Sequence, residues 1–418
     1  MTTKKSLSDS LLFSALICLV VTGCTTVSNR EESAPVLTSG PIKDQIAMAQ
    51  PAPMALGTFT SVPEFNTVDR YPIWYATNRA YGLKKNDPTK IPSCTSDFKQ
   101  GHGKDVRGEA TVYGKCWVNV PATHTSGETN GVKIDPANFK GFAKFADFWI
   151  DVNKNRTAAT DHSVLVFIHG FNVSFQDAII RGAQLGHDLA MPTTVVYSWP
   201  TSDRERLTLN LVHDIAAIPA GYPADEANIE ASENAIGDFL IQMIQKAHDE
   251  NFSLHVIAHS MGNRGVLRGL DRAYWKAGGK IQGKIDQIVL AAPDVDNEVF
   301  TNLSEVYSKI AKRTTIYTSK KDWAVEMSKA LHDAPRVGYA IPTVVIKPFD
   351  TVDTSDAPSH WLLSGWEDHL IGHGYFADKS SVLYDLKQVF RGVSPNERGL
   401  TSCGQNQRYY TFSKSNCN

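Results

Sequence analysis

Short apolar runs rich in β-branched residues recur along the chain, separated by longer stretches of mixed character. The run at 163–168 reads SVLVFI and is apolar after its first position. A run of this kind is typical of a parallel strand that is buried on both faces of a sheet. Similar apolar runs predict strands at 71–76, 110–121, 194–198, 254–258, 287–291 and 314–318.

Between these runs, apolar residues recur three or four positions apart, the period of a helix with one buried face. Ser174 and Asp177 have the spacing of a capping box and predict a helix that extends to residue 189. Strands that alternate with helices predict an α/β fold, with a mostly parallel central sheet and helices on both faces. The same period predicts further helices at 230–248, 266–274, 299–312 and 381–390.

Composition and charge exclude some classes of protein. The chain has 418 residues, a formal net charge of −2 and 42% hydrophobic residues, which is ordinary globular composition. Because there is no basic excess, we expect no nucleic-acid partner. No apolar stretch reaches the roughly 18 residues that a membrane-spanning helix requires.

The first residues resemble a bacterial export signal. Two lysines precede an apolar run at 11–21 that is too short to span a bilayer. The following Val-Thr-Gly-Cys, ending at Cys24, resembles the lipobox of bacterial lipoproteins. This resemblance implies a signal peptide at 1–23, removed in the mature protein, and a lipid on Cys24 that anchors the protein to a membrane. Because Thr25 follows rather than an aspartate, the resemblance implies the outer membrane, facing the periplasm.

The cysteines fit an exported protein. The chain has six cysteines, of which one lies in the predicted signal peptide and one is Cys24. The remaining four allow three pairings, and no C-x-x-C motif indicates a zinc or thioredoxin-like site. Short separations favour loop closure, so we expect disulfides between Cys94 and Cys116 and between Cys403 and Cys417.

The segment LHVIAHSMGNRG at 254–265 predicts a buried strand, a sharp turn that carries Ser260, and a helix. This is the layout of a nucleophile elbow, whose usual pattern is G-x-S-x-G. Ala258 replaces the first glycine and Gly262 keeps the second, so both positions remain small. A turn with a capping serine would give the same five-residue pattern, so the assignment depends on the rest of the chain.

A serine nucleophile needs a base and a group that orients the base. In α/β hydrolases these follow in the order serine, acid, histidine. Asp322, just after the strand at 314–318, is the preferred acid, and Asp294, after the strand at 287–291, is the alternative. Either aspartate could instead cap the next helix.

His373 is the preferred base because it lies between two glycines, ahead of the last predicted helix. His332, His360 and His369 compete with it, and the preference depends on position alone. A histidine in a glycine-flanked loop at this point can reach back over the edge of the sheet.

Anion stabilisation is predicted at His-Gly-Phe-Asn, 169–172, which directly follows a strand. The backbone N–H groups of Phe171 and Met261 would donate to a developing oxyanion. His169 and His259 are interpreted as packing or hydrogen-bonding residues.

The segments IHGFN, VVYSWP, IAHSMGN, AAPDVD, YTSKKD and GHGYF together resemble a family of bacterial α/β hydrolases described broadly as esterase/lipase-like. The resemblance covers about residues 71–392 and implies the α/β-hydrolase fold, with a triad of Ser260, Asp322 and His373. Substrates of this family are largely unassigned.

The predicted domain organisation follows from these patterns. Residues 24–68 are rich in Ser, Thr, Pro and Ala, and we expect a flexible tether there. A hydrolase domain occupies 69–392, and within it 203–229 is longer than the expected connection and forms either a lid or a surface elaboration. Residues 393–418 form a tail closed by a disulfide.

The predicted function is a lipid-anchored serine hydrolase that cleaves a small-molecule or lipid carboxylic ester through an acyl-enzyme. Thioester, amide and acyl-transfer chemistry would use the same residues. No H-E-x-x-H or comparable set is present, so we expect no metal and no cofactor. The alternative is an envelope binding or scaffold lipoprotein that keeps the fold without catalysis.

Overall fold

The structure of the protein is a computed structural model, and it describes residues 68–81, 93–95, 98–99, 104–159, 162–201, 211–358, 373–404 and 408–417. The predicted signal peptide, Cys24 and all but the last residue of the predicted tether lie outside the described residues. His360 and His369 also lie outside them. No helix in the described ranges is long and apolar enough to cross a membrane.

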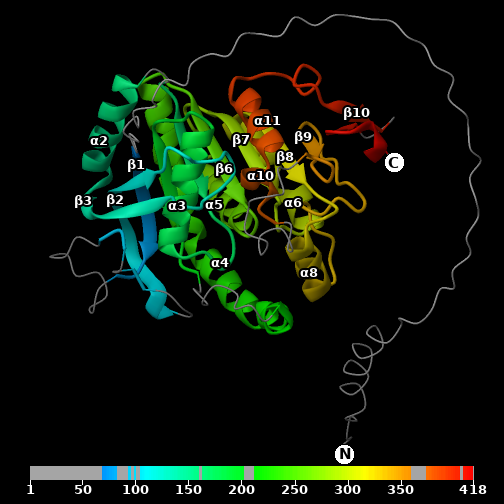
Figure 1. The fold of residues 1–418 in the computed structure, drawn as a ribbon, viewed down its shortest axis with the longest axis horizontal. Helices are drawn as coiled ribbons and strands as arrows, with labels where there is room; N and C mark the ends of the chain where they lie inside the picture. The colour runs from blue at the N-terminus through cyan, green and yellow to red at the C-terminus, as the bar shows by residue number, and fades with distance from the viewer. Residues whose placement is uncertain are drawn as a thin grey trace, which may run out of the picture. The chain divides into compact units, whose positions relative to one another are not determined.

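A single mixed sheet forms the centre of the described chain (Figure 1). Neighbouring strands from β11 to β1 in this sheet are parallel, whereas the pairs β10/β11, β1/β2 and β2/β3 are antiparallel. The predicted mostly parallel sheet is therefore confirmed. Across the sheet the strands are β10 (Thr401–Cys403), β11 (Tyr409–Thr411), β9 (Asp350–Asp353), β8 (Ala311–Thr318), β7 (Ile285–Ala291), β6 (Leu254–His259), β4 (Val164–Ile168), β5 (Thr194–Ser198), β1 (Asp69–Arg79), β2 (Arg107–Val120) and β3 (Lys133–Phe142).

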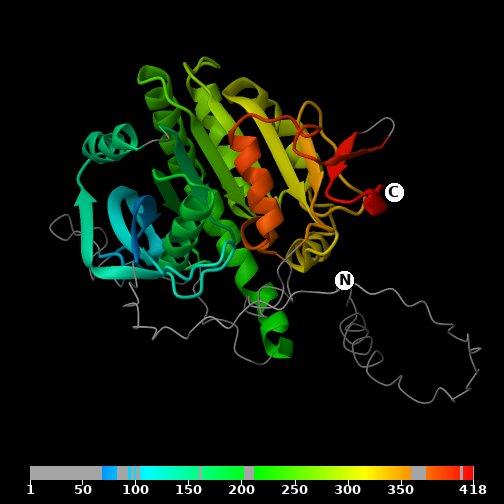
Figure 2. The ribbon, with the colours of Figure 1, turned by 45° about the horizontal axis from the view of Figure 1, so that its top comes forward.

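Helices cover both faces of the sheet, as predicted (Figure 2). One face packs against α2 (Phe145–Ala158), α4 (Leu211–Asp249), α5 (Gly262–Lys276), α6 (Asn297–Leu303) and α7 (Glu305–Ile310). The other packs against α3 (Phe175–Asp188), α10 (Tyr375–Asp378) and α11 (Ser380–Phe390). The remaining elements are α8 (Trp323–His332), η1 (Lys104–Val106) and η2 (Lys414–Asn416).

The strand β4 shows why the apolar runs form interior strands. All five of its residues are buried. Val164, Val166 and Ile168 belong to the core on one face, and Leu165 and Phe167 belong to the core on the other. Because successive side chains of a strand point to opposite faces, an interior strand needs apolar residues at both sets of positions.

Two predicted helices have the wrong extent. The helix expected at 230–248 is α4, which begins at Leu211 and therefore includes much of the segment 203–229. The single helix expected at 299–312 is two short helices that meet at Ser304, and β8 begins at Ala311. Apolar period alone did not detect the break, because buried residues continue on both sides of it.

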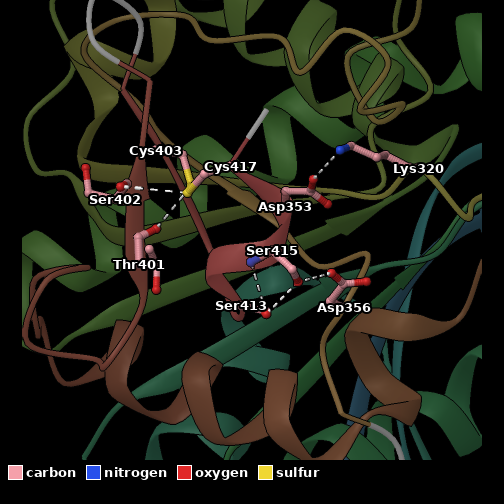
Figure 3. The surroundings of a disulfide bond; sticks show 9 residues. All are labelled: Lys320, Asp353, Asp356, Thr401, Ser402, Cys403, Ser413, Ser415 and Cys417. Atoms are coloured by element: carbon pink, nitrogen blue, oxygen red, sulfur yellow. Dashed lines mark hydrogen bonds and ion pairs between the residues drawn. A yellow bond between two sulfur atoms is a disulfide. The ribbon is translucent and has the colours of Figure 1, made fainter.

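Both predicted disulfides, Cys94–Cys116 and Cys403–Cys417, are present. The second joins β10 to the C-terminal η2 segment (Figure 3). In this segment the Ser415 hydroxyl donates to the Asp356 carboxylate over 3.4 Å. The residues expected as a tail therefore supply the last two strands of the sheet and are closed by a disulfide.

Candidate active site

Ser260 lies on a sharp turn between β6 and α5. Its backbone φ of +51° is in the left-handed region, which costs a non-glycine residue on the order of 1–3 kcal/mol. The Ser260 N–H donates to the Ala291 carbonyl over 2.9 Å, and its own carbonyl accepts from the Asn263 N–H over 3.0 Å. The strand, turn and helix predicted around Ser260 are all present, and bonds on both sides hold the strained turn.

Small residues allow this turn to lie against the turn that follows β4. A Cβ atom at Gly262 would overlap the carbonyl oxygen of His169. A Cβ atom at Gly170 would lie 2.8 Å from the Cβ atom of Ser260. Larger side chains at either glycine would therefore separate Ser260 from the segment predicted to stabilise an oxyanion.

The side chain of Asn263 stabilises the turn by hydrogen bonds to backbone carbonyls. The sequence analysis did not single this residue out. Its side chain is buried, and its amide group lies 3.0 Å from the carbonyl oxygen of Ala258 and 3.1 Å from that of Ser260. The same amide also lies 3.3 Å from the carbonyl oxygen of Ala291 at the end of β7. Asn263 thus connects the strand, the turn and the neighbouring strand.

Asp322 and His373 are hydrogen-bonded. The Nδ1–H of His373 donates to the Asp322 carboxylate, at 2.8 and 2.9 Å from its two oxygens. Asp322 is fully buried and also caps α8, because its Oδ1 accepts from the Val325 N–H over 3.1 Å. The acid role and the capping role proposed from sequence are therefore compatible in one carboxylate.

The pKa of the His373 imidazole is raised above its ordinary value. Burial on its own favours the neutral ring, but the charge and the hydrogen bond of Asp322 outweigh that effect. The carboxylate therefore stabilises the protonated ring. It also fixes the tautomer, with Nδ1 protonated and Nε2 free to accept a proton.

His259, the residue before Ser260, connects the elbow to His373. The centroids of the two imidazole rings lie 4.6 Å apart, and the His259 Nε2–H donates to the His373 carbonyl over 3.2 Å. The His259 ring also stacks on Phe376, with a centroid distance of 4.5 Å. Burial and the neighbouring His373 lower the pKa of His259, so this ring is neutral. It contributes packing and one hydrogen bond.

No hydrogen bond joins Ser260 to His373 in the part of the chain that is described. The contact between His259 and His373 nevertheless brings the histidine loop to the residue beside the serine. In unliganded enzymes the bond between nucleophile and base is often long, and it tightens when substrate binds.

Asp294, the alternative acid, belongs to a different network. Its carboxylate accepts from the hydroxyls of Tyr222 and Ser328 and pairs with Arg264 at 3.4 Å. Nε of Arg336 lies 3.6 Å from Oδ1 of Asp294. These partners hold Asp294 between α4, α5 and α8, whereas the carboxylate that accepts from His373 is that of Asp322.

His332, one of the competing histidines, is also bound elsewhere. Its Nδ1 donates to the Ser328 carbonyl over 2.8 Å, and its Nε2 lies 3.3 Å from a Glu226 oxygen. This histidine therefore contributes to the packing of α8 against α4.

The two predicted oxyanion donors belong to residues next to Gly170 and Gly262, the two glycines where the turn at Ser260 meets the turn after β4. Met261 follows Ser260 at the start of α5, and Phe171 follows Gly170, which contacts the serine. Within the described residues, neither the Phe171 N–H nor the Met261 N–H donates to a protein acceptor.

Asp225 holds the loop that contains Phe171. The backbone N–H of Asn172 donates to Oδ2 of Asp225 over 3.1 Å. Asn172 itself adopts a φ of +52°, and Asp225 is fully buried on α4. The sequence analysis missed this residue because it lies in the segment interpreted as a lid or surface elaboration.

His169 has a structural environment. Its Nδ1–H donates to the Gly170 carbonyl over 2.9 Å, and its Nε2 accepts from the Ser198 hydroxyl over 3.1 Å. The ring stacks on Trp199 with a centroid distance of 5.3 Å. Burial and the nearby Arg79 guanidinium lower its pKa to about 3, so the ring stays neutral.

The family model described as "Alpha/beta hydrolase of unknown function" (DUF900) matches residues 146–391, more than half of the chain. The chain belongs to this family. The match includes Ser260, the residues at 169–172, Asp322 and His373. The resemblance inferred from the sequence motifs is therefore confirmed, together with the α/β-hydrolase fold.

Two solved structures are similar at low identity. An arylesterase shares 11% identity, covering 70% of this chain and 85% of its own, with a TM-score of 0.29. The Legionella pneumophila phospholipase PlaB, solved in complex with thio-NAD, shares 11% identity and covers 60% of this chain and 67% of its own, with a TM-score of 0.26. Scores this low say nothing about the substrate of this chain. No curated protein matches it.

Proposed function

We propose that this member of the α/β-hydrolase family is a serine hydrolase that cleaves carboxylic esters, with Ser260 as nucleophile. The observation that carries the proposal is the hydrogen bond from His373 Nδ1 to the buried carboxylate of Asp322. The strained turn at Ser260 supports it, because the φ of +51° is maintained by bonds on both sides.

In the proposed reaction, the Ser260 hydroxyl attacks the ester carbonyl while Nε2 of His373 accepts its proton. Asp322 stabilises the imidazolium that forms and keeps the ring oriented. His373 then donates this proton to the alcohol as the ester bond breaks. The alcohol departs, and the acyl group remains bonded to Ser260. Water, deprotonated by His373, cleaves this acyl-enzyme and restores the serine.

The oxyanion would accept hydrogen bonds from the N–H groups of Phe171 and Met261. Donors that are already in position stabilise the charge without reorganisation, and losing one typically reduces turnover by about 10² to 10³-fold. The close approach of Gly170 to Ser260 supports this arrangement, because Phe171 is the next residue along the chain.

Covalent labelling tests the proposal. The native chain should react with a fluorophosphonate probe, Ser260→Ala should not, and Ser308→Ala should label like the native chain because Ser308 is exposed on α7. Absence of labelling in a native chain with a cooperative thermal transition would favour the non-catalytic scaffold instead.

We also propose that the enzyme is anchored by a lipid on Cys24 and acts on an ester of the bacterial envelope, at the outer membrane facing the periplasm. The two disulfides support export to an oxidising compartment. Metabolic labelling with an alkyne-tagged fatty acid should mark the native chain and leave Cys24→Ala unmarked. Equal labelling of both chains would contradict the anchor.

A further inference from the structure

A second cluster of chemically active side chains lies outside the candidate active site, where the end of α3 meets the loop between β2 and β3. It consists of His124, His187 and Asp188, each of which offers one nitrogen or oxygen atom that lies within 4.8 Å of those of the other two. His124 and Asp188 are 64 residues apart, so no local motif indicates the cluster in the sequence.

The two imidazole rings converge on one carboxylate oxygen of Asp188. Nε2 of His124 lies 2.7 Å from Oδ1 of Asp188, and Nδ1 of His187 lies 3.4 Å from the same oxygen. The two imidazole rings meet edge to face, with centroids 5.0 Å apart. A single ion placed between them would therefore reach one nitrogen from each ring and one oxygen.

Burial and neighbouring hydrogen bonds hold His124 and Asp188 in this arrangement. The His124 side chain is only 4% exposed, and its Nδ1 has no hydrogen-bond partner in the described part of the chain. Its polar contact is the one to Asp188. The other oxygen of Asp188 accepts from the Gly127 N–H over 2.8 Å and from the Gln184 amide over 2.6 Å. Partners of this kind orient a ligating carboxylate in protein metal sites.

We propose that His124 Nε2, His187 Nδ1 and Asp188 Oδ1 bind Zn²⁺, with water as the fourth ligand. Two imidazoles and a carboxylate are a donor set that Zn²⁺ accepts. Bonds of about 2.0–2.2 Å in a tetrahedron place ligand atoms about 3.3 Å apart, close to the 3.4 Å between His187 and Asp188. Binding lengthens the shorter His124–Asp188 contact by about 0.6 Å. The His187 side chain, 31% exposed, gives the ion and its water a path from solvent.

The position of the site shows which segments a bound ion would connect. The Gln184 amide that holds Asp188 also donates to the Ala377 carbonyl of α10 over 3.1 Å. A Cβ atom at Gly127 would overlap the carbonyl oxygen of Asp378, so the loop after β2 touches the same helix. Because α10 begins two residues after His373, bound Zn²⁺ would connect the loop after β2 and α3 to the segment that follows His373. This inference differs from the sequence-based expectation of no metal, and it does not depend on the chemistry of Ser260.

Zinc titration of the full chain tests the site. After treatment with a chelator and its removal, the native chain and His248→Ala should each bind one ZnCl₂ equivalent with the same Kd and melt at a higher temperature with zinc. His187→Ala should bind at least about tenfold more weakly and lose the thermal shift. His248 is an exposed histidine on α4 and controls for general loss of imidazole.

A spectroscopic measurement adds information on the ligands. Co²⁺ in place of Zn²⁺ should give the intense visible absorption of a tetrahedral site in the native chain and not in His187→Ala. The proposal would be overturned if the native chain showed no saturable zinc binding. It would also be overturned if His187→Ala bound zinc with native affinity, since the three residues would then be only a hydrogen-bonded cluster.

Discussion

Asp322 serves two purposes in this protein, and an asparagine can take over only one of them. Its carboxylate caps α8 through the Val325 N–H and accepts from His373. Asparagine is as good a helix cap as aspartate. It cannot supply a negative charge to an imidazolium, and its amide can select the wrong tautomer of the ring.

We therefore predict that Asp322→Asn reduces kcat for ester hydrolysis by about 10³ to 10⁴-fold. At a pH above the raised pKa of His373, where the ring is neutral in the native chain, the melting temperature should stay close to native. Asp294→Asn is the matched control. It removes a charge that faces Arg264, so it should lower the free energy of unfolding by about 1–3 kcal/mol and change kcat of the folded enzyme much less. The opposite ranking of the two kcat values would assign the acid role to Asp294.

The raised pKa of His373 predicts the pH dependence. The base must be neutral to accept a proton, so kcat/KM should rise with pH through the pKa of His373 in the free enzyme. Because Asp322 raises this pKa, the midpoint of the acidic limb should lie above the ordinary value of about 6.5.

The raised pKa of His373 makes stability fall with rising pH over the range in which kcat/KM rises. The protonated His373–Asp322 pair contributes its full stabilisation below the ordinary pKa of about 6.5, and this contribution is lost as pH rises through the raised pKa. Hydrolysis rates and thermal melts at matched pH values measure both effects. An acidic limb with a midpoint below 6.5 would contradict the proposed pairing.

Among the helices and strands, α4 supports the candidate site in a way that the sequence did not predict. Asp225 on this helix accepts from the Asn172 N–H and so holds the loop that carries Phe171. Asp225→Ala should loosen the loop and reduce kcat and kcat/KM together, by up to the roughly 10²-fold expected for losing one oxyanion donor. Asp238→Ala, an exposed position on the same helix, should retain native rates.

The measurement for Asp225 is steady-state hydrolysis combined with a thermal melt. A rise in KM with unchanged kcat would indicate that Asp225 supports substrate binding rather than the transition state. Loss of the cooperative melt would be uninformative about the loop, so Asp225→Asn provides a second variant. Its amide oxygen can still accept from Asn172, and its rate should lie between those of the native chain and Asp225→Ala.

The elements of this fold were predictable to different degrees. The interior strands and the helix after Ser174 follow from apolar period and capping, and the structure confirms them. The strand β3 was missed because it lies at an edge and is mostly exposed, which leaves no apolar run to detect. The early turns of α4 were missed because Pro219 and Pro223 interrupt the sequence pattern that predicts a helix.

The residues of the candidate site divide in the same way. Ser260, Asp322 and His373 could be proposed because chain order and strand ends constrain where such residues lie. His259 and Asp225 act through contacts between distant segments, such as the 3.2 Å bond from His259 to the His373 carbonyl. Asn263 adds a contact to Ala291 on the neighbouring strand to its local bonds in the turn. The zinc cluster is a similar case, since it depends on how the loop after β2 packs on α3. Spacing in one sequence carries no signal for contacts of this kind.

For the molecule as a whole, the two disulfides lie near opposite ends of the sheet. Cys403 is in β10, the strand at one edge, and Cys116 is in β2, next to the other edge strand, β3. Edge strands lack a partner on one side and open more readily than central strands. Each disulfide closes a short loop, with sequence separations of 22 and 14 residues. A disulfide that closes a loop of about 15 residues stabilises the folded protein by about 3 kcal/mol relative to the unfolded chain.

This placement predicts that reduction loosens the ends of the sheet before its centre. Hydrogen–deuterium exchange of the native chain in dithiothreitol should increase in β2, β3, β10 and β11, with little change in β4, β6 and β7. Ser260 stands at the end of β6, so its rate of fluorophosphonate labelling should stay near that of the oxidised protein. If reduction instead raised exchange in β6 as much as in β10 and abolished labelling, the disulfides would be supporting the central strands, and stability would not divide along the sheet.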